Sequence, residues 1–302
     1  MTVPELEILK VDVFTDELYM GNPASLVLEA DDVDEVQMQR IAFELGSPAT
    51  VFALRSRKAD LRLRYFSAHD EEQLSGHGTI GAVWCLAERK AFGEVTGGRQ
   101  RIETNAGILP FTIEGDVDGP KKIWMTQKRP MFASEGDIKE IASALGTGVD
   151  SLFHDEFPIG RASTGLPCLI VPIKSIEVIG KLEPRRDELT ALSRELDVAG
   201  IYAFTWGVLD QESTAHARFF APHPDLQEDA ASGLPAGALG AYFVENEFIQ
   251  RDRYDSIVIE QGHWMGRPSK IFVKVEKRGP AIHKVEVGGS AIVSFKGRLT
   301  VP

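Results

Sequence analysis

The run Thr79-Ile80-Gly81-Ala82-Val83-Trp84-Cys85-Leu86-Ala87, which follows Gly76, decides the fold because it is apolar on every side. A helix on the surface of a globular protein has a polar face, so a helix without one is expected to be buried. A second run of this kind, Leu234-Pro235-Ala236-Gly237-Ala238-Leu239-Gly240-Ala241-Tyr242-Phe243-Val244, follows Gly233, about half a chain length later. The sequence therefore predicts two central helices, each wrapped by a sheet.

Each half of the chain also carries strand patterns and one more polar helix. The strict alternation at 60–65 and the pattern at 6–14 predict half-buried strands. Polar helices are expected at 33–45 and at about 184–196. We therefore expect an α/β (α+β) fold of two pseudo-symmetric domains, each a curved, mainly antiparallel sheet around a central apolar helix.

The domain boundary is predicted in the turn-rich stretch Gly115-Asp116-Val117-Asp118-Gly119-Pro120. It divides the chain into an N-terminal domain, 1–118, and a C-terminal domain, 119–290. The final strand pattern, within 291–302, could return to either domain. A length of 302 residues with 43% apolar side chains is enough for two hydrophobic cores.

Composition and charge narrow the possible partners. The 33 Lys and Arg residues against 45 Asp and Glu residues give a net charge of −12, which opposes binding to nucleic acid or to an anionic membrane surface. No run approaches the length of a membrane span, and no basic-then-apolar leader opens the chain, so a cytoplasmic location is expected. Cys85 and Cys168 lie in apolar stretches and are expected to be reduced core thiols.

Both apolar helices are expected to begin at a glycine that follows acidic residues. The first N–H groups of a helix have no partner within it and carry a partial positive charge, so they can bind a carboxylate without a lysine. Two such helix starts facing one cleft predict a site for a small, anionic substrate. The candidate substrate-binding residues are Gly76, Gly78, Thr79, Ser232 and Gly233.

Several motifs follow one another in a fixed order along the chain. They are Val11-Asp12-Val13-Phe14-Thr15 with Gly21-Asn22-Pro23-Ala24, Gly76-His77-Gly78-Thr79, Ser163-Thr164-Gly165-Leu166-Pro167, Phe220-Ala221-Pro222, Glu228-Asp229-Ala230-Ala231-Ser232-Gly233, and Glu260-Gln261-Gly262 with Met265-Gly266-Arg267-Pro268-Ser269. In this order they resemble the PhzF-like family of phenazine biosynthesis, whose fold is that of diaminopimelate epimerase. The resemblance runs through most of the chain.

The resemblance implies a homodimer with an active site in the cleft between the domains of each chain, and no metal or organic cofactor. It implies isomerisation by proton transfer, in which a glutamate of the first domain and an aspartate of the second move the proton. Asp229 matches that aspartate, and Gly76 with His77 matches the pair that binds substrate. Asp229 and His77 are therefore the candidate catalytic residues.

The family's glutamate does not carry over to this chain. The family pattern falls on Pro48-Ala49-Thr50-Val51-Phe52, so that Ala49 stands at the place of the carboxylate, and alanine transfers no proton. Gly78 replaces a proline, and Leu234 stands where many relatives have serine. His77 is the leading candidate to replace the glutamate, since imidazole titrates near neutral pH.

Simpler interpretations of these residues remain open. Asp229 could cap the helix that follows it, and His77 could pack at a helix start without touching substrate. Ala49, Glu71 and His223 are further candidate pocket residues, although isolated charged or histidine side chains in loops are more often solvated or structural. The acidic and histidine residues show no metal-ligand spacing, so no metal site is expected.

Two functions follow from these residues. The first is a cofactor-independent isomerase, or a related lyase or cyclase, that transfers a proton on a small metabolite bearing a carboxylate or carbonyl group. Asp229 alone could remove and return the proton in a one-base mechanism. The second is a non-catalytic small-molecule-binding or scaffold protein that retains the fold, which Ala49 favours and Asp229 and His77 oppose.

Overall fold

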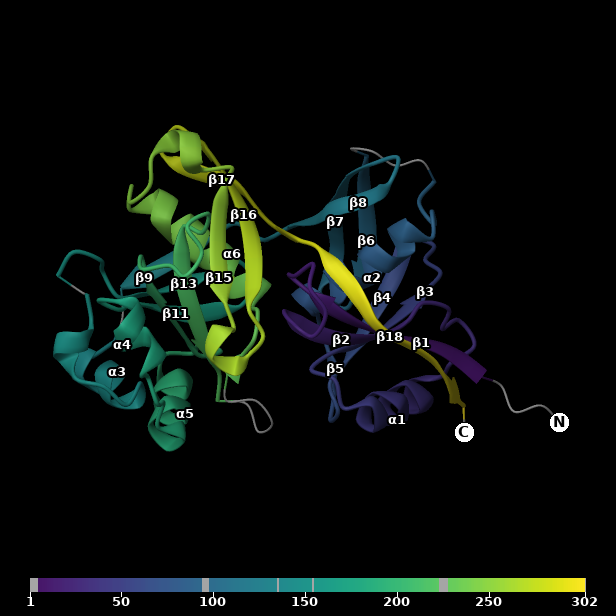
Figure 1. Ribbon diagram of the computed structural model, residues 1–302, viewed down its shortest axis with the longest axis horizontal. Helices are drawn as coiled ribbons and strands as arrows, with labels where there is room; N and C mark the ends of the chain where they lie inside the picture. The colour runs from purple at the N-terminus through teal and green to yellow at the C-terminus, as the bar shows by residue number, and fades with distance from the viewer. Residues whose placement is uncertain (1–4, 94–97, 135, 154, 223–227, 302) are drawn as a thin grey trace. The chain divides into compact units, whose positions relative to one another are not determined.

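The computed structural model describes residues 5–93, 98–134, 136–153, 155–222 and 228–301 (Figure 1). The chain forms two compact units, of which the first comprises Met1–Thr126 with Gly288–Pro302 and the second Gln127–Val287. Among the described residues, no helix is both long and apolar enough to cross a membrane.

The first unit ends later than the sequence predicts. Its strands are β1 (Glu5–Val13), β2 (Asn22–Val27), β3 (Thr50–Leu54), β4 (Leu61–Phe66), β5 (Glu71–Glu72), β6 (Arg99–Thr104), β7 (Gly107–Asp116), β8 (Gly119–Thr126) and β18 (Ala291–Thr300), and its helices are α1 (Glu35–Leu45) and α2 (Gly76–Glu88). The turn at 115–120 joins β7 to its antiparallel partner β8, so it is a hairpin and not a boundary. The C-terminal strand β18 pairs with β1 along its length and belongs to this unit.

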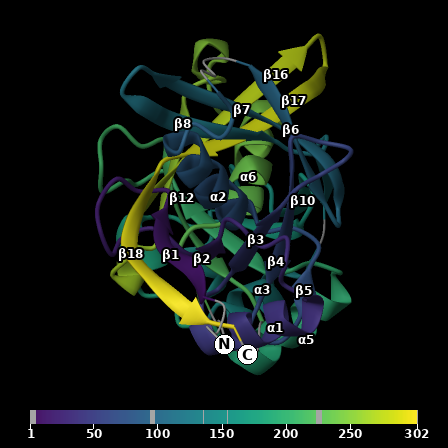
Figure 2. The same cartoon turned by 90° about the vertical axis from the view of Figure 1, so that its right-hand side faces the viewer.

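Helix α2 lies at the centre of the first unit, where it contacts β1, β2, β3, β8 and β18 (Figures 1 and 2). Its apolar side chains are buried on several sides, among them Ile80, Ala82, Val83 and Cys85. A Cβ atom at Gly81 would lie 2.9 Å from a methyl of Val11, so glycine allows the helix to approach the sheet closely. The polar helix α1 covers the outer face of this sheet with Met38, Ile41 and Ala42.

The second unit repeats this plan within its own residues. Its strands are β9 (Met131–Ser134), β10 (Gly160–Ser163), β11 (Pro167–Pro172), β12 (Ile201–Thr205), β13 (Ala215–Phe220), β14 (Glu228–Asp229), β15 (Ile257–Gln261), β16 (Ser269–Arg278) and most of β17 (Ala281–Gly289). Its helices are α3 (Ile138–Ala144), α4 (Ile176–Gly180), α5 (Arg186–Glu195) and α6 (Gly233–Glu245), with three 3-10 turns, η1 (Val149–Ser151), η2 (Arg251–Arg253) and η3 (His263–Met265). Helix α6 is buried against β10, β11 and β16, and Gly240 lies where a Cβ atom would be 2.7 Å from a methyl of Val273.

Strand pairing shows that the two units have the same order of elements. In the first, β2 runs parallel to β3 across α1, and β3, β4 and β5 follow as antiparallel neighbours. In the second, β11 runs parallel to β12 across α4 and α5, and β12, β13 and β14 follow in the same way. The fold is therefore pseudo-symmetric, with α1 equivalent to α5, α2 to α6, and the hairpin β4–β5 to β13–β14.

Candidate active site

The start of α2 in the first unit is capped by a serine. The Ser75 hydroxyl accepts the N–H of Gly78 at 3.2 Å, and the Ser75 carbonyl accepts both the N–H and the hydroxyl of Thr79. The Thr79 oxygen lies 2.7 Å from the Tyr65 hydroxyl, and since its own hydrogen is already donated, it accepts from Tyr65. Gly78 and Thr79 therefore stabilise the helix start with groups that the sequence predicts would bind substrate.

The groups still available at this helix start are the N–H groups of Gly76 and His77. Within the described part of the chain neither makes a hydrogen bond. They are the first two N–H groups of a 13-residue helix, where the positive end of the helix dipole lies. An anionic group placed there would accept two hydrogen bonds.

The His77 imidazole is partly enclosed. Its Nδ1 lies 3.4 Å from the Ser75 hydroxyl, and its buried Nε2 has no hydrogen-bond partner among the described residues. Burial lowers the pKa of His77 from its ordinary value of 6.5 to about 4, against a weaker opposing contribution from the Pro23 carbonyl. The ring is therefore neutral at neutral pH, although the sequence predicts titration near neutral pH, so it can accept a proton but holds almost no imidazolium from which to return one.

Ala49 lies immediately before β3 and is buried, with 2% of its surface exposed. Its carbonyl accepts the N–H of Ser25 at 2.9 Å, which ties it to β2. Two residues further on, Val51 of β3 packs so closely on α2 that a Cβ atom at Gly78 would lie 2.7 Å from a Val51 methyl. The glycine at position 78 is thus required by packing, and position 49 offers no group for proton transfer.

The second unit places a carboxylate at the equivalent helix start. The Ser232 hydroxyl donates to Asp229 Oδ2 at 2.5 Å. Unlike Ser75, Ser232 makes no capping bond to its helix, because the residue three positions on is Pro235, which has no N–H. Its hydroxyl is therefore available to hold the carboxylate of Asp229.

A buried glutamine fixes the direction of this hydrogen bond. The amide NH₂ of Gln261 donates to the Asp229 carbonyl at 2.7 Å and to the Ser232 hydroxyl oxygen at 3.1 Å. The amide oxygen accepts the N–H of Ser232 and the hydroxyl of Tyr202, whose pKa is raised by burial so that it stays a donor. Because Ser232 already accepts from Gln261, its own hydrogen goes to Asp229. The network holds Asp229 as an acceptor.

The first N–H groups of α6 also remain available. Those of Gly233 and Leu234 make no hydrogen bond within the described ranges. Ser232, whose N–H the sequence predicts would bind substrate, is occupied by Gln261 instead. Within the described residues each unit therefore offers a pair of helix-start N–H groups without an acceptor, with His77 at the first helix start and Asp229 at the second.

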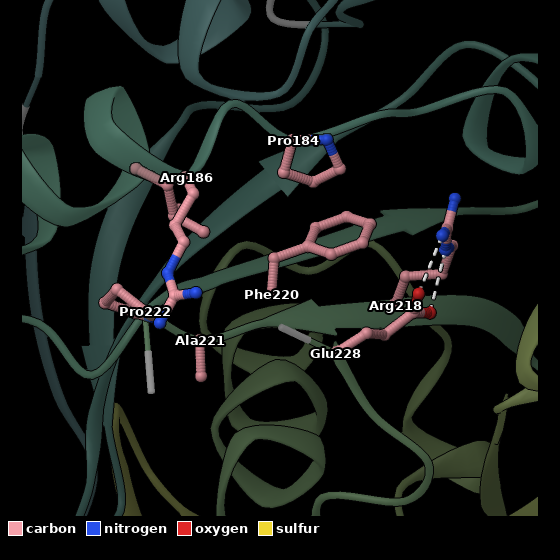
Figure 3. Close-up of a pocket in the computed structure, with 8 residues that line it drawn as sticks. Pro184, Arg186, Arg218, Phe220, Ala221, Pro222 and Glu228 are labelled. Atoms are coloured by element: carbon pink, nitrogen blue, oxygen red, sulfur yellow. Dashed lines mark hydrogen bonds and ion pairs between the residues drawn. The ribbon is translucent and has the colours of Figure 1, made fainter. Parts of the chain in front are cut away.

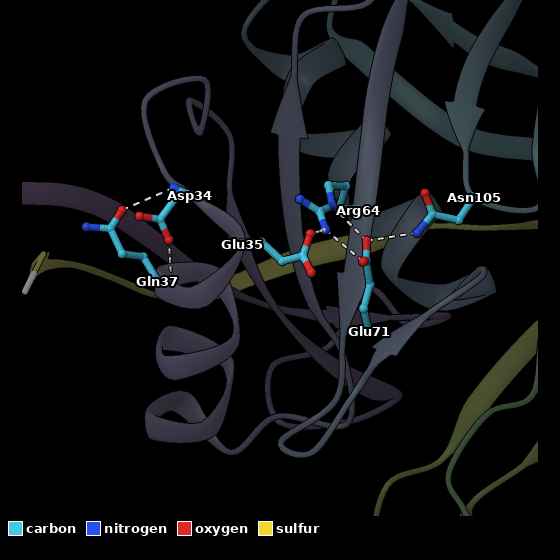
Figure 4. A network of polar contacts seen from close by, with 6 residues as sticks. All are labelled: Asp34, Glu35, Gln37, Arg64, Glu71 and Asn105. Carbon is cyan, nitrogen blue, oxygen red and sulfur yellow. Dashed lines mark hydrogen bonds and ion pairs between the residues drawn. The ribbon is translucent and has the colours of Figure 1, made fainter.

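The remaining pocket candidates are Glu71 and His223. The carboxylate of Glu71 accepts two hydrogen bonds from Arg64, both at 2.7 Å, and one from Asn105 at 2.8 Å (Figure 4). Glu71 therefore links β4 to β5, and its carboxylate is occupied by Arg64 and Asn105. His223 lies outside the described residues. Among those described, no group of three or more His, Cys, Asp or Glu side chains is arranged to hold a metal ion.

Sequence reasoning missed the network behind Asp229. Gln261 and Tyr202 are far from Asp229 in the sequence, and both are fully buried. The only indication was that Gln261 lies within one of the ordered motifs, at the end of a strand. A polar amide at the end of a buried strand needs partners, which could have marked Gln261 as part of a site.

Comparison with known proteins places this chain among close relatives. A family model described as phenazine biosynthesis-like protein (PhzC-PhzF) matches residues 11–297. The "Uncharacterized isomerase YfhB" of Bacillus subtilis (strain 168) is 36% identical over 292 residues, which are 96% of this chain and 97% of that protein. An "Uncharacterized isomerase" of Deinococcus radiodurans is 35% identical over 98% of this chain and 95% of its own length.

Solved structures show the same fold. A Bacillus anthracis phenazine biosynthesis protein of the PhzF family superposes with a TM-score of 0.88 at 31% identity and covers 98% of this chain and 99% of its own. A hydroxyproline epimerase from Agrobacterium vitis superposes with a TM-score of 0.65 at 13% identity, covering 99% and 92% of the two chains. The latter likeness shows the fold alone.

Proposed function

Since the chain belongs to the phenazine biosynthesis-like (PhzC-PhzF) family, we propose that it is an isomerase that moves a proton on a small metabolite bearing a carboxylate or carbonyl group, with no cofactor. The fold is that of diaminopimelate epimerase, as the motifs predict. The observation that carries the proposal is the Asp229 carboxylate, which accepts a hydrogen bond from the Ser232 hydroxyl while Gln261 holds the backbone carbonyl of Asp229.

In the proposed reaction Asp229 acts as a single base. It removes a proton from the carbon next to the carbonyl or carboxylate group, and the electron pair of the broken C–H bond moves onto the oxygen. The proton then returns from Asp229 to a carbon of the same substrate, a new C–H bond forms, and the carboxylate is restored. No electrons are gained or lost, so the reaction needs no redox partner.

The negative charge that develops on the substrate oxygen needs hydrogen-bond donors. The N–H groups of Gly233 and Leu234 lie one and two residues after Ser232 at the start of α6, and they have no acceptor among the described residues. Backbone donors of this kind are fixed in place before the reaction, and removal of one such donor costs roughly a hundredfold or more in rate in known enzymes.

Ala49 favours a second function, in which the chain binds a small molecule without converting it. An enzyme with two acid–base groups could remove a proton with one and return it with the other. With alanine at this place, the family's first acid–base group is missing, and the lowered pKa of His77 leaves almost no imidazolium at neutral pH to return a proton. The isomerase proposal therefore requires one-base chemistry, whereas a binding protein requires no base.

Exchange of hydrogen with solvent separates the two functions. The protein is incubated in heavy water with small 2-oxo acids and unsaturated carboxylates, and deuterium in each compound is measured by mass spectrometry. We expect incorporation, or conversion to an isomer, with the wild type and a loss of about a hundredfold or more with Asp229→Asn. Asp252→Asn, which removes an exposed carboxylate of the same unit, is the control.

The outcome that contradicts an isomerase is binding without chemistry. If compounds of these classes bind the wild type but show neither deuterium uptake nor conversion, the binding function is supported. If Asp229→Asn exchanges as fast as the wild type, Asp229 is not the base.

A further inference from the structure

The strand that carries Asp229 is held from both of its faces. Strand β14 has only two residues, Glu228 and Asp229, which pair with the end of β13. Consecutive side chains of a strand point to opposite faces of the sheet. Asp229 accordingly meets Ser232 at the start of α6, whereas Glu228 meets Arg218 on the other face. So short a strand has few backbone hydrogen bonds, so its position depends strongly on these side chains.

One arginine clamps the side chain of Glu228. Arg218 on β13 donates from Nε and Nη2 to the two carboxylate oxygens of Glu228, at 2.8 and 2.7 Å (Figure 3). The guanidinium lies 4.6 Å from the centroid of the Phe220 ring. The side chains of Arg218 and Glu228 are only 9% and 14% exposed. Two parallel hydrogen bonds between a guanidinium and a carboxylate fix the angle between the groups as well as their distance.

Arg218 is itself held in one orientation. Its Nη1 donates to the carbonyls of Ile179 and Leu182, at 2.9 and 3.1 Å, where helix α4 ends. The guanidinium therefore makes four hydrogen bonds, two to a carboxylate and two to backbone carbonyls. Lysine carries the same charge but lacks the planar fork of donors, so it cannot make both sets of contacts.

Arg218 also contacts the turn that follows the glutamine of the Asp229 network. The amide of Gln261 donates to the Asp229 carbonyl at 2.7 Å. Three residues later in the chain, Trp264 of η3 places its ring centroid 5.5 Å from the Arg218 guanidinium. A Cβ atom at Gly180 would lie 2.5 Å from this ring, so glycine allows the ring to pack on the end of α4. The two segments that hold Asp229, namely β14 and the turn after Gln261, thus meet at Arg218.

The first unit contains an equivalent arginine–glutamate pair. Arg64 on β4 makes two hydrogen bonds to Glu71 on β5, both at 2.7 Å (Figure 4). Its guanidinium lies 5.2 Å from the centroid of the Phe66 ring, and its side chain is 13% exposed. Substitution of Arg64 therefore disturbs a buried ion pair of the same kind in the other unit, which makes it a matched control for Arg218.

We propose that Arg218 is a positioning residue for Asp229, which it holds in place through Glu228 on one side and Trp264 on the other. The inference rests on the proposed function, in which Asp229 removes and returns the proton. A base has to lie within hydrogen-bond reach of the proton that it takes, and a catalytic group has to be held within about 0.5 Å of its productive position. A displacement of about 1 Å can cost roughly a hundredfold in rate.

The variant Arg218→Lys tests the effect on the reaction. The assay is deuterium incorporation into the 2-oxo acid or unsaturated carboxylate that the wild type labels fastest, measured over a range of substrate concentrations. We expect the rate at saturation to fall about tenfold or more, while the half-saturating concentration changes less than about threefold, because the base is displaced and the binding groups remain. Arg64→Lys should leave both values as in the wild type.

The side-chain amide of Gln261 reports the same geometry without a substrate. Its NH₂ group donates to the Asp229 carbonyl and the Ser232 hydroxyl, so its hydrogens should exchange slowly with water. This exchange is followed by NMR, and the resonances are assigned through their loss in Gln261→Met. Arg218→Lys should accelerate it at least about tenfold and leave the backbone amides of α2 at wild-type rates, whereas a general loss of stability would accelerate both.

Glu228→Gln guards against misfolding of Arg218→Lys, because it keeps the shape of the side chain and removes its charge. It should produce the same two changes. The proposal is overturned if, in the folded variants, either the rate at saturation or the exchange at Gln261 stays at the wild-type value, or if Arg64→Lys changes both equally. If the wild type itself incorporates no deuterium, the isomerase function fails, and the exchange at Gln261 then decides whether Arg218 holds the Asp229 network.

Discussion

Replacing His77 by leucine, the residue at the equivalent position of α6, should remove a pH dependence from the stability of the protein. The folded state holds the pKa of His77 at about 4, against 6.5 for an imidazole in the unfolded chain. The unfolded state therefore takes up the proton first as the pH falls. The stabilisation from neutral His77 is fully present above pH 6.5 and is lost as the pH falls toward 4.

The magnitude follows from these two values. Between pH 7.5 and pH 5, protonation of His77 in the unfolded chain lowers the free energy of unfolding by at most about 2 kcal/mol. The slope is no steeper than about 1.4 kcal/mol per pH unit. The assay is urea unfolding of the wild type and of His77→Leu at both pH values, since the other titrating groups cancel in the difference. His283→Leu, at an exposed histidine, is the control and should behave as the wild type.

The reasoning fails if wild type and His77→Leu lose equal stability between pH 7.5 and pH 5. It also fails if the imidazole resonances of His77, followed by NMR, titrate above pH 6. In that case His77 would carry a proton near neutral pH, and it would again be a candidate to replace the family's glutamate.

Other substitutions test the packing and polar contacts of the two helix starts. Gly78→Ala should lower the free energy of unfolding by about 1–3 kcal/mol, because the new methyl would lie 2.7 Å from a Val51 methyl on β3. Gly76→Ala, where the nearest atom lies at 3.8 Å, should lower it by less than about 1 kcal/mol in the same urea assay. Gln261→Met leaves several buried polar groups without partners and should cost roughly 3 kcal/mol in thermal or urea unfolding; a cost near zero would contradict the network. Glu71→Gln should reduce the loss of stability on acidification, because the hydrogen bond from Arg64 lowers the Glu71 pKa and this stabilisation is lost as the pH falls through it; equal slopes in a pH series would contradict this.

The buried helices were predictable because a helix that is apolar on every side has no face suited to solvent. The runs after Gly76 and Gly233 form α2 and α6, and the polar helix expected at 33–45 is α1 at Glu35–Leu45. The domain boundary was not predictable from turn residues. A turn rich in glycine and aspartate joins two strands of one sheet as readily as it joins two domains, and only the pairing of β7 with β8 distinguishes these cases.

For the candidate site, the sequence predicted the positions of single residues but not the contacts that those residues make. The motif located Asp229, but its partners come from strands that are distant in sequence, and no periodicity relates them. The same holds for His77, whose lowered pKa depends on burial by residues that sequence spacing does not reveal. Burial and long-range hydrogen bonds are properties of packing, so they appear only in the folded chain.

The two helix starts differ through the third residue of each helix. In α2 this residue is Gly78, whose N–H occupies the hydroxyl of the capping Ser75. In α6 it is Pro235, which has no N–H, so the hydroxyl of Ser232 turns to Asp229 instead. The loss of one backbone donor thus converts a helix cap into a group that orients a carboxylate. In this pseudo-symmetric fold, the local difference leaves the carboxylate of Asp229 oriented by a hydroxyl that the first helix start uses for its own cap.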